Sequence, residues 1–312
     1  MAKNNLGLPY KGSKNTIAER IVGLMPAGGK FLDACCGGGA VLEAAYLSGK
    51  YSSVTGMDID SGIILLLKAV FHDFGSIDYE HRQLRTAEDF KRANSERKTL
   101  DDAVTRFTCS FGFNGYDYQW GERRRHLKYL AHQALTLPTL DERRQAYREF
   151  MKEVIAQGKT EGERWSIELK ELQNLCHTEQ ATNICRLQKV ESVMKAASEK
   201  SKTTIELREG SMFEIDYTPY DVVYFDPPYA NTKGYDKSKF DFTRFRELIE
   251  TLARQDKHVF VSEYSCPSPM FTEIWKTEKQ MSQCATKTVN VVEKLYYSRG
   301  VEWKCDSTRR SD

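Results

Sequence analysis

The apolar and polar positions of the chain first indicate two strand-turn-helix units. The short apolar stretch from Phe31 to Asp33 runs into a glycine-rich segment, and the helix formers of Ala40–Ala45 follow it. Further along, the β-branched run Ser53–Asp58 again ends in an acid and precedes an apolar helix over Ile63–Phe71. This succession predicts the opening of a Rossmann-like, doubly wound α/β sheet.

The pattern then changes and later returns. From Gly75 to about Lys202 the chain is polar, with Leu and Ile at helical spacing, so we expect mostly helices, including one within Leu169–Met194. Strand-like runs reappear at Thr203–Leu207, Tyr220–Asp226 and His258–Ser262. Between the last two, Phe242–Ala253 predicts a crossover helix. We therefore predict a core formed by residues 1–75 and 203–312, split around a largely helical insertion at 76–202.

Composition narrows the class of protein. A chain of 312 residues can hold one α/β core and a large insertion, and no apolar run approaches the roughly 18 residues of a membrane span. The N-terminus lacks the pattern of a secretory signal, so we expect a cytoplasmic protein without a membrane partner. The eight cysteines include no CxxC pair, which predicts reduced thiols and no metal site. A net charge of +2 is too small to identify a polyanionic partner.

The glycine turn and the two strand-ending acids form the first candidate site. Asp33 precedes the turn, and Gly37 and Gly39 lie within it, where the backbone of a helix entrance can approach a nucleotide-like ligand. Asp58 could accept hydrogen bonds from ribose hydroxyls. A nicotinamide enzyme, a plain strand-helix joint or a helix N-cap at Asp58 would give the same pattern.

The sequence Asp226-Pro227-Pro228-Tyr229 is the sharpest chemical signal. It ends a buried strand, and two prolines fix the backbone with carbonyl oxygens at the carboxyl end of the sheet. The Asp226 carboxylate and the Pro227 carbonyl could accept hydrogens from an exocyclic amine while Tyr229 stacks on a base. A simple proline turn is the alternative interpretation.

Together these motifs resemble the Dam-like family of N6-adenine DNA methyltransferases, and the resemblance spans nearly the whole chain. Tyr10 to Lys14 is similar to the W-A-G-G-K motif, and Phe31 to Val41 is similar to E-P-F-x-G-x-G with Ala34-Cys35 in place of Pro-Phe. The resemblance implies S-adenosyl-L-methionine (AdoMet) as cofactor. It places that cofactor at Tyr10, Lys14, Asp33, Gly37, Gly39, Asp58, Ile59 and Asp226. It makes Asp226, Pro227, Pro228 and Tyr229 catalytic.

Within the insertion, Ser110 to Tyr116 resembles the family's Y-G-Y-N-G loop, which contacts DNA beside a flipped base. The resemblance implies DNA contacts from Phe113, Asn114, Tyr116 and Tyr118. GATC-specific relatives carry an arginine where this chain has Tyr118, which argues against GATC as the target. A turn in a protein core would also explain the loop.

A basic run follows this loop. Arg123, Arg124, Arg125 and Lys128 could neutralise DNA phosphates, although a solvated helix face would look the same. We therefore expect an adenine-specific methyltransferase that acts on double-stranded DNA by base flipping, of phage or restriction-modification type. One alternative is a methyltransferase that acts on cytosine N4, on RNA or on a protein amide. Another is a relative that binds DNA but has no catalytic activity. The sequence does not determine whether the protein has a cognate restriction endonuclease as a partner, or its oligomeric state.

Overall fold

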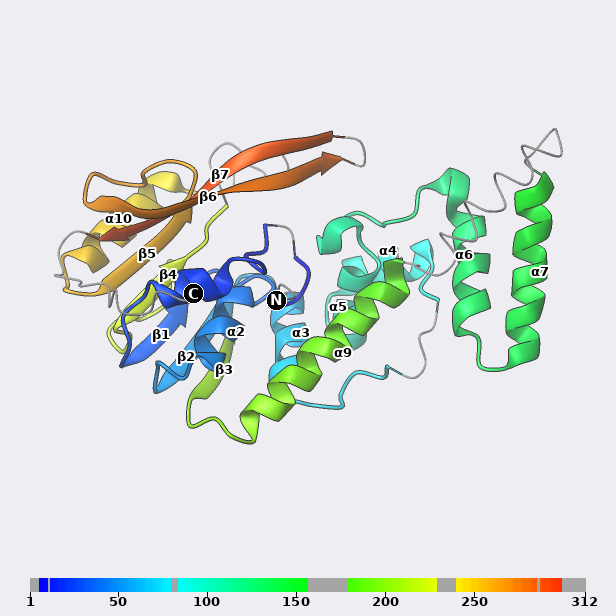
Figure 1. Ribbon diagram of the computed structural model, residues 1–312, viewed down its shortest axis with the longest axis horizontal. Helices are drawn as coiled ribbons and strands as arrows, with labels where there is room; N and C mark the ends of the chain where they lie inside the picture. The colour runs from blue at the N-terminus through cyan, green and yellow to red at the C-terminus, as the bar shows by residue number, and fades with distance from the viewer. Residues whose placement is uncertain are drawn as a thin grey trace, which may run out of the picture. The chain divides into compact units, whose positions relative to one another are not determined.

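The computed structural model describes residues 6–10, 12–79, 84–156, 179–228, 240–284 and 287–298. Contacts divide the chain into two compact units, whose elements are labelled in Figure 1. The sheet unit comprises Met1–Gly7, Lys14–Asp60 and Lys200–Asp312, and the helical unit comprises Leu8–Ser13 and Ser61–Glu199.

The sheet unit contains the strands that the structure describes. They are β1 (Lys30–Asp33), β2 (Ser53–Asp58), β3 (Thr204–Glu209), β4 (Val222–Phe225), β5 (His258–Glu263), β6 (Phe271–Cys284) and β7 (Lys287–Ser298). Their order is β3-β2-β1-β4-β5-β7-β6, in which the first five strands are parallel and β7 is antiparallel to both β5 and β6. The predicted doubly wound α/β sheet is confirmed, and its strand order switches direction between β1 and β4.

Helices cover both faces of this sheet. They are α1 (Ala18–Gly23), α2 (Ala40–Leu47) and α10 (Phe242–Ala253), and α10 has the bounds that its sequence predicted. On one face Phe245 and Ile249 of α10 share a core with Leu32 of β1. On the other face, a side chain at Gly56 would collide with Leu42 of α2. Burial on both faces explains the continuous apolar run of β4.

Register places three acids at one edge of the sheet. Asp33 is the last residue of β1 and Asp58 the last of β2, while Asp226 follows the last residue of β4. Because the three strands are parallel neighbours, their carboxyl ends meet at this edge. This is the edge at which open α/β sheets bind ligands.

The helical unit contains the remaining helices. They are α3 (Ser61–Phe71), α4 (Ala87–Glu96), α5 (Leu100–Thr108), the 3₁₀ turn η1 (Phe111–Phe113), α6 (Glu122–Thr136), α7 (Leu140–Ala156) and α9 (Glu179–Ser198). Helix α3 packs on α5 and α9, so contacts group it with the insertion, whereas the sequence division placed residues 61–75 in the core. Helices α6 and α7 form a hairpin that buries Leu127, Leu130, Phe150 and Val154 along its seam.

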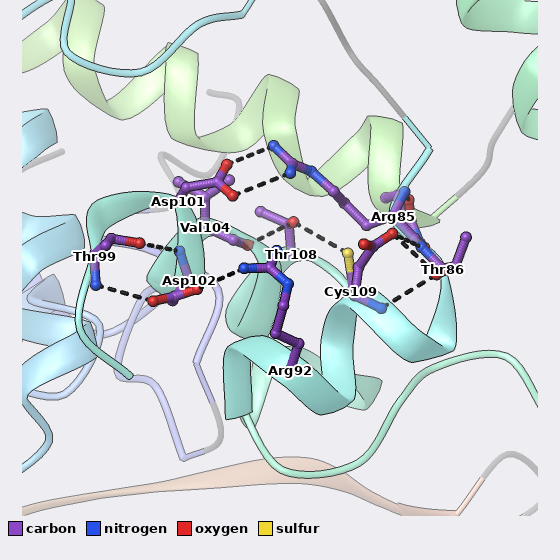
Figure 2. Close-up of polar contacts among 11 residues, drawn as sticks. Arg85, Thr86, Arg92, Thr99, Asp101, Asp102, Val104, Thr108 and Cys109 are labelled. Carbon is purple, nitrogen blue, oxygen red and sulfur yellow. Dashed lines mark hydrogen bonds and ion pairs between the residues drawn. The ribbon is translucent and has the colours of Figure 1, made fainter. Parts of the chain in front are cut away.

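Helices α4 and α5 are held by the polar contacts drawn in Figure 2. Thr99 and Asp102 form a capping box at the start of α5, which satisfies backbone N–H groups that the helix leaves unpaired. Asp102 also faces Arg92 of α4, whose Nη1 lies 3.6 Å from Asp102 Oδ1. Arg85 pairs with Asp101 at 2.6 Å, but Asp101 is exposed and Arg85 only half-buried, so this pair adds little stability. The contact between Arg92 and Asp102 links α4 to the start of α5.

No helix within the described ranges is both long enough and apolar enough to cross a membrane.

Candidate cofactor and catalytic site

The acid at the end of β2 is tied to the glycine turn after β1. Asp58 Oδ2 accepts a 2.9 Å hydrogen bond from the N–H of Gly37, and Asp58 Oδ1 accepts one of 3.0 Å from the N–H of Asp60. Burial raises the pKa of Asp58 although these hydrogen bonds lower it. Gly39 adopts a left-handed φ of 73° as the N-cap of α2, a conformation that glycine takes without strain.

Asp33 is the most deeply buried acid of the site. Its side chain is only 1% exposed, and its Oδ1 has no hydrogen-bond partner among the described residues. Burial, and then the charge of Asp226, raises the pKa of Asp33 well above its usual range. A buried carboxyl oxygen without a donor is costly, so this position favours a ligand that brings a positive charge or an N–H group.

A buried lysine joins Asp226 to a second acid. Lys14, whose side chain is 3% exposed, donates to Asp226 Oδ2 at 2.6 Å, and its Nζ lies 3.0 Å from Glu293 Oε1. Burial alone would lower the pKa of Lys14, but the two carboxylates raise it above its usual range. The two carboxylates therefore favour the charged form of Lys14, which holds one oxygen of Asp226 in place.

Glu293 was not predicted from the sequence. It lies on β7 and is buried, as are Leu295 and Tyr297, which share its face of the strand. An acid at an inward position among apolar residues was the available signal, because a carboxylate is rarely buried there unless it is paired.

The prolines and Ile59 complete the described part of this edge. Pro227 is buried and Pro228 half-buried directly after Asp226. Ile59, 77% exposed, presents an apolar side chain to solvent just beyond β2. Tyr229, the last residue of the predicted catalytic motif, lies outside the described residues.

Two thiols flank the site, that of Cys36 buried and that of Cys35 half-buried. Burial, and then the charge of Asp58, raises the pKa of both Cys35 and Cys36 well above the usual range. The thiolate is the reactive form of cysteine, so these side chains remain neutral. Within the described ranges, no cluster of three or more potential ligands could hold a metal ion.

Tyr10 belongs to the helical unit by its contacts. Its ring centroid lies 6.1 Å from that of Phe107 on α5, so this aromatic packs within the helical unit. The resemblance assigned Tyr10 to the cofactor, and that role stays a prediction.

The loop after α5 differs from the prediction at Phe113. The side chain of Phe113 is 1% exposed and packs on Phe107 at 5.6 Å, with a left-handed φ of 59° that aromatic residues rarely adopt. Phe113 is thus a core residue of the helical unit. Its burial does not favour the predicted DNA contact, which stays a prediction. The exposed aromatics of the loop are Phe111 and Tyr116, each 56% exposed. Apolar character alone could not show which ring points inward.

Asn114 shapes this loop. Its Oδ1 accepts from the N–H of Tyr116 at 2.8 Å and from that of Asp117 at 3.0 Å, and its Nδ2 donates to Asp117 Oδ2 at 3.0 Å. These bonds form a side-chain-closed turn that fixes the backbone at Tyr116. Asn114 therefore fixes the backbone that carries the exposed Tyr116. Its own predicted contact with DNA stays a prediction.

Tyr118 and Arg125 are engaged within the helical unit. Tyr118 donates from its hydroxyl to the carbonyl of Arg85 at 2.9 Å, and the Arg125 guanidinium carbon lies 5.6 Å from the centroid of the Tyr118 ring. Lys128 is half-buried on α6. The side chains of Arg123 and Arg124 lie outside the described residues, so their predicted phosphate contacts stay predictions.

A shallow surface depression lies beside Tyr116. Its lining consists of Phe90, Lys91, Asn94, Ser95, Arg97 and Tyr116, which include two cations and no acid. Arg97 ends α4 with a left-handed φ of 52°, donates from Nε to the carbonyl of Asn94 at 2.8 Å, and lies 5.8 Å from the centroid of the Tyr116 ring. The guanidinium is thereby held over an exposed aromatic ring.

Comparisons with known proteins give only weak structural likenesses. The chain matches no protein-family model, and no curated protein matches it. Two structures of the rRNA methyltransferase AviRa from Streptomyces viridochromogenes are each 12% identical to this chain. Both matches cover 91% of this chain; they cover 83% and 82% of the AviRa chains, with TM-scores of 0.37 and 0.35. A complex of SMU.472 with SAH is 15% identical and covers 40% of this chain and 29% of its own, with a TM-score of 0.21. Likeness at this level supports no statement about function.

Proposed function

We propose that this protein transfers a methyl group from AdoMet to the exocyclic N6 of adenine in double-stranded DNA. The observation that carries the proposal is the placement of Asp226-Pro227-Pro228 at the end of β4, with the Asp226 carboxylate fixed by a buried lysine. Beside it, on the neighbouring strands, stand the glycine turn and the acids expected of a nucleotide-like cofactor site.

The residues at this edge fit AdoMet. The cofactor carries a sulfonium, an ammonium group and ribose hydroxyls, and Asp33 offers a buried oxygen to which no described residue donates a hydrogen bond. Asp58 stands at the tip of β2, where it can accept from ribose hydroxyls in addition to its two backbone partners. Ile59 supplies an exposed apolar surface for a base, and the turn at Gly37 and Gly39 allows close approach of the backbone.

The chemistry assigned to the protein is orientation and charge stabilisation. When bound, AdoMet supplies an activated methyl group on a cationic sulfur. Asp226 and the Pro227 carbonyl accept the two N6 hydrogens of the target base, which directs the nitrogen lone pair toward that methyl group. As the N6–carbon bond forms and the carbon–sulfur bond breaks, the positive charge passes from sulfur to N6, where the fixed negative charge of Asp226 stabilises it. N6 then releases one proton to solvent, and the neutral thioether S-adenosylhomocysteine would leave. Tyr229 is proposed to stack on the base.

The DNA contacts are proposed to lie on the helical unit. Exposed Phe111 and Tyr116 offer stacking surfaces at a base step or at the gap left by a flipped nucleotide, and Arg97 and Lys91 offer charge to the backbone phosphates. Arg123, Arg124 and Arg125 stay in the proposed phosphate-contacting set. Phe113 is replaced in the stacking role by Phe111.

The test is transfer of labelled methyl from AdoMet to duplex DNA, followed by separation of the nucleosides. Label in N6-methyl-2′-deoxyadenosine released from the DNA is the expected result. Label in a cytosine nucleoside, or transfer to RNA but not DNA, would replace adenine in DNA by one of the alternative amino substrates. Absence of transfer to any nucleic acid by folded protein that binds AdoMet would contradict the proposal.

A further inference from the structure

Strands β6 and β7 continue as a two-stranded ribbon beyond the rest of the sheet. β7 pairs with β5 over a short stretch that begins at Lys294, which lies opposite Glu263, the last residue of β5. β6 and β7 stay paired with each other as far as Cys284 and Lys287. The part from Lys287 to Glu293 therefore extends past β5, roughly 20 Å at about 3.4 Å a residue. We call residues 277–284 and 287–293 the projecting ribbon, which Figure 1 shows continuing past β5.

The projecting ribbon leaves the sheet at the candidate catalytic edge. It extends past the carboxyl end of β5, and β4, whose carboxyl end precedes Asp226, is the parallel neighbour of β5. A contact confirms this placement. Glu293, at the base of the ribbon, lies 3.0 Å from Lys14 Nζ, which donates to Asp226 Oδ2 at 2.6 Å. A large substrate with its reacting group at Asp226 would therefore lie beside the ribbon.

The described side chains at the base of the ribbon are largely in water. Lys276, Glu278 and Val292 are exposed, whereas Leu295 and Tyr296, where β7 pairs with β5, are buried. A two-stranded ribbon that extends into solvent is at best marginally stable by itself. A ribbon of this length, with β6 at the edge of the sheet, is thus better suited to contacting a partner than to stabilising the fold.

The composition of the ribbon favours a polyanion as that partner. In the sequence from 279 to 291, Lys279 and Lys287 are the only charged residues. Most other residues of this stretch have amide or hydroxyl groups: Gln280, Ser282, Gln283, Thr286, Thr288 and Asn290. Lysines, amides and hydroxyls are the side chains that contact nucleic-acid phosphates, and a two-stranded ribbon also fits the width of a DNA major groove.

We infer that the projecting ribbon binds backbone phosphates of the duplex whose target base lies at Asp226, and that Lys279 and Lys287 carry this contact. The inference rests on the proposed function. It adds a contact from the sheet unit to those proposed for the helical unit, and it holds the duplex close to the reacting base.

The decisive variant is the double substitution Lys279→Gln and Lys287→Gln. Fluorescence titrations with duplex DNA at several salt concentrations should show that the slope of log affinity against log salt falls by about two. At about 0.15 M salt the affinity should fall about tenfold or more, and near 1 M salt the variant and the wild type should bind equally. KM for DNA should rise, while kcat at saturating DNA and Kd for AdoMet should stay within about twofold.

The matched control is the double substitution Lys30→Gln and Lys202→Gln. Both residues are exposed, and they lie at the amino ends of β1 and β3, on the opposite edge of the same sheet. The control removes the same charge and should keep the wild-type slope. A second test variant shortens the ribbon by replacing residues 279–291 with Asn-Gly, a two-residue hairpin turn between Glu278 and Val292. It should lose the same slope as the double lysine variant.

The outcomes separate this inference from the proposed function. Urea unfolding checks that each variant folds, and the shortened ribbon serves if the double lysine variant does not. A wild-type slope in a folded test variant, or an equal loss in the control, would overturn the role of the ribbon alone. So would sedimentation that shows a wild-type dimer and a shortened-ribbon monomer, because the ribbon would then join two copies of the chain. If the wild type binds and methylates no duplex DNA, the proposed function fails and the inference falls with it.

Discussion

Asp58 accepts a 2.9 Å hydrogen bond from the backbone N–H of Gly37, so the acid that ends β2 also fixes the glycine turn that follows β1. We therefore expect Asp58→Ala to weaken AdoMet binding by roughly 1.5–3 kcal/mol, the range of a charge-assisted hydrogen bond. Titration calorimetry measures the change. Glu206→Gln, at an exposed site on adjacent β3, should bind AdoMet normally. An unchanged affinity in folded Asp58→Ala protein would remove Asp58 from the cofactor site.

Asp226→Ala tests the acceptor for the amine. Turnover should drop by orders of magnitude, because the transition state loses a charge worth several kcal/mol (roughly 3–4 by comparison with single oxyanion-hole donors). DNA binding should survive, since the proposed DNA contacts lie on the helical unit. Labelled-methyl transfer and a DNA-binding titration measure the two effects. Near-normal transfer by a folded variant would refute the assignment of Asp226.

Asp33 predicts a pH dependence of stability. Its pKa is raised by burial and by Asp226, so the folded state favours the protonated form. Protonated Asp33 makes its full contribution to the free energy of unfolding below the unfolded-state pKa of about 3.9. That contribution is lost as the pH rises through the raised pKa of the folded state. Asp33→Asn cannot ionise, so its free energy of unfolding without cofactor should exceed that of the wild type by a margin that grows with pH. Urea titrations at several pH values would disprove this if the margin stayed constant.

The surface beside α4 predicts DNA-binding defects in both Tyr116→Ala and Arg97→Ala. Loss of a stacking ring should cost about 1–3 kcal/mol, and loss of one phosphate contact should lower the slope of log affinity against log salt by about one. Fluorescence titrations with duplex DNA at several salt concentrations measure both. Tyr147→Ala and Arg144→Ala on α7 are matched exposed controls. Equal behaviour of test and control variants would exclude this surface.

Alanine variants of Phe113 and Phe111 should affect different properties, the first the free energy of unfolding and the second the affinity for DNA. Phe113→Ala opens a cavity against Phe107 and should cost about 3–5 kcal/mol of unfolding free energy. Phe111→Ala, at an exposed position, should change stability by less than about 0.5 kcal/mol and weaken DNA binding instead. Urea unfolding and DNA titration of both variants check this contrast. A stable Phe113→Ala protein would show that the ring is not part of the core.

Strands β1 to β5 and the helices α2 and α10 of the core were predictable because each carries a local signal. The strands β1 to β5 and the helix α10 follow apolar runs that the sequence displays directly. Strand β6 was missed, and its register shift between Glu273 and Trp275 breaks the alternation by which a strand is recognised. Strand β7 was missed as well, and with it Glu293.

In the candidate site, too, residues with a local sequence signal were predictable and contacts between distant segments were not. Asp33, Asp58 and Asp226 could be predicted because each ends a strand with a recognisable pattern. The bond between Lys14 and Glu293 could not, because it joins segments that only the antiparallel pairing of β7 with β5 brings together. The burial of Phe113 could not be predicted, because one sequence pattern fits both a buried and an exposed ring.

The late position of β7 in the chain has a consequence for synthesis. Lys14 leaves the ribosome long before Glu293, and the strand that carries Glu293 enters the sheet only by inserting between β5 and β6. Until that happens, a nascent chain can pair β1 with β2 and β4 but cannot balance the charge of Lys14 against both acids. Closing so distant a contact costs chain entropy and slows folding. A partly made or C-terminally shortened chain would therefore carry the strands that end in Asp33, Asp58 and Asp226 without the ion pair between Lys14 and Glu293.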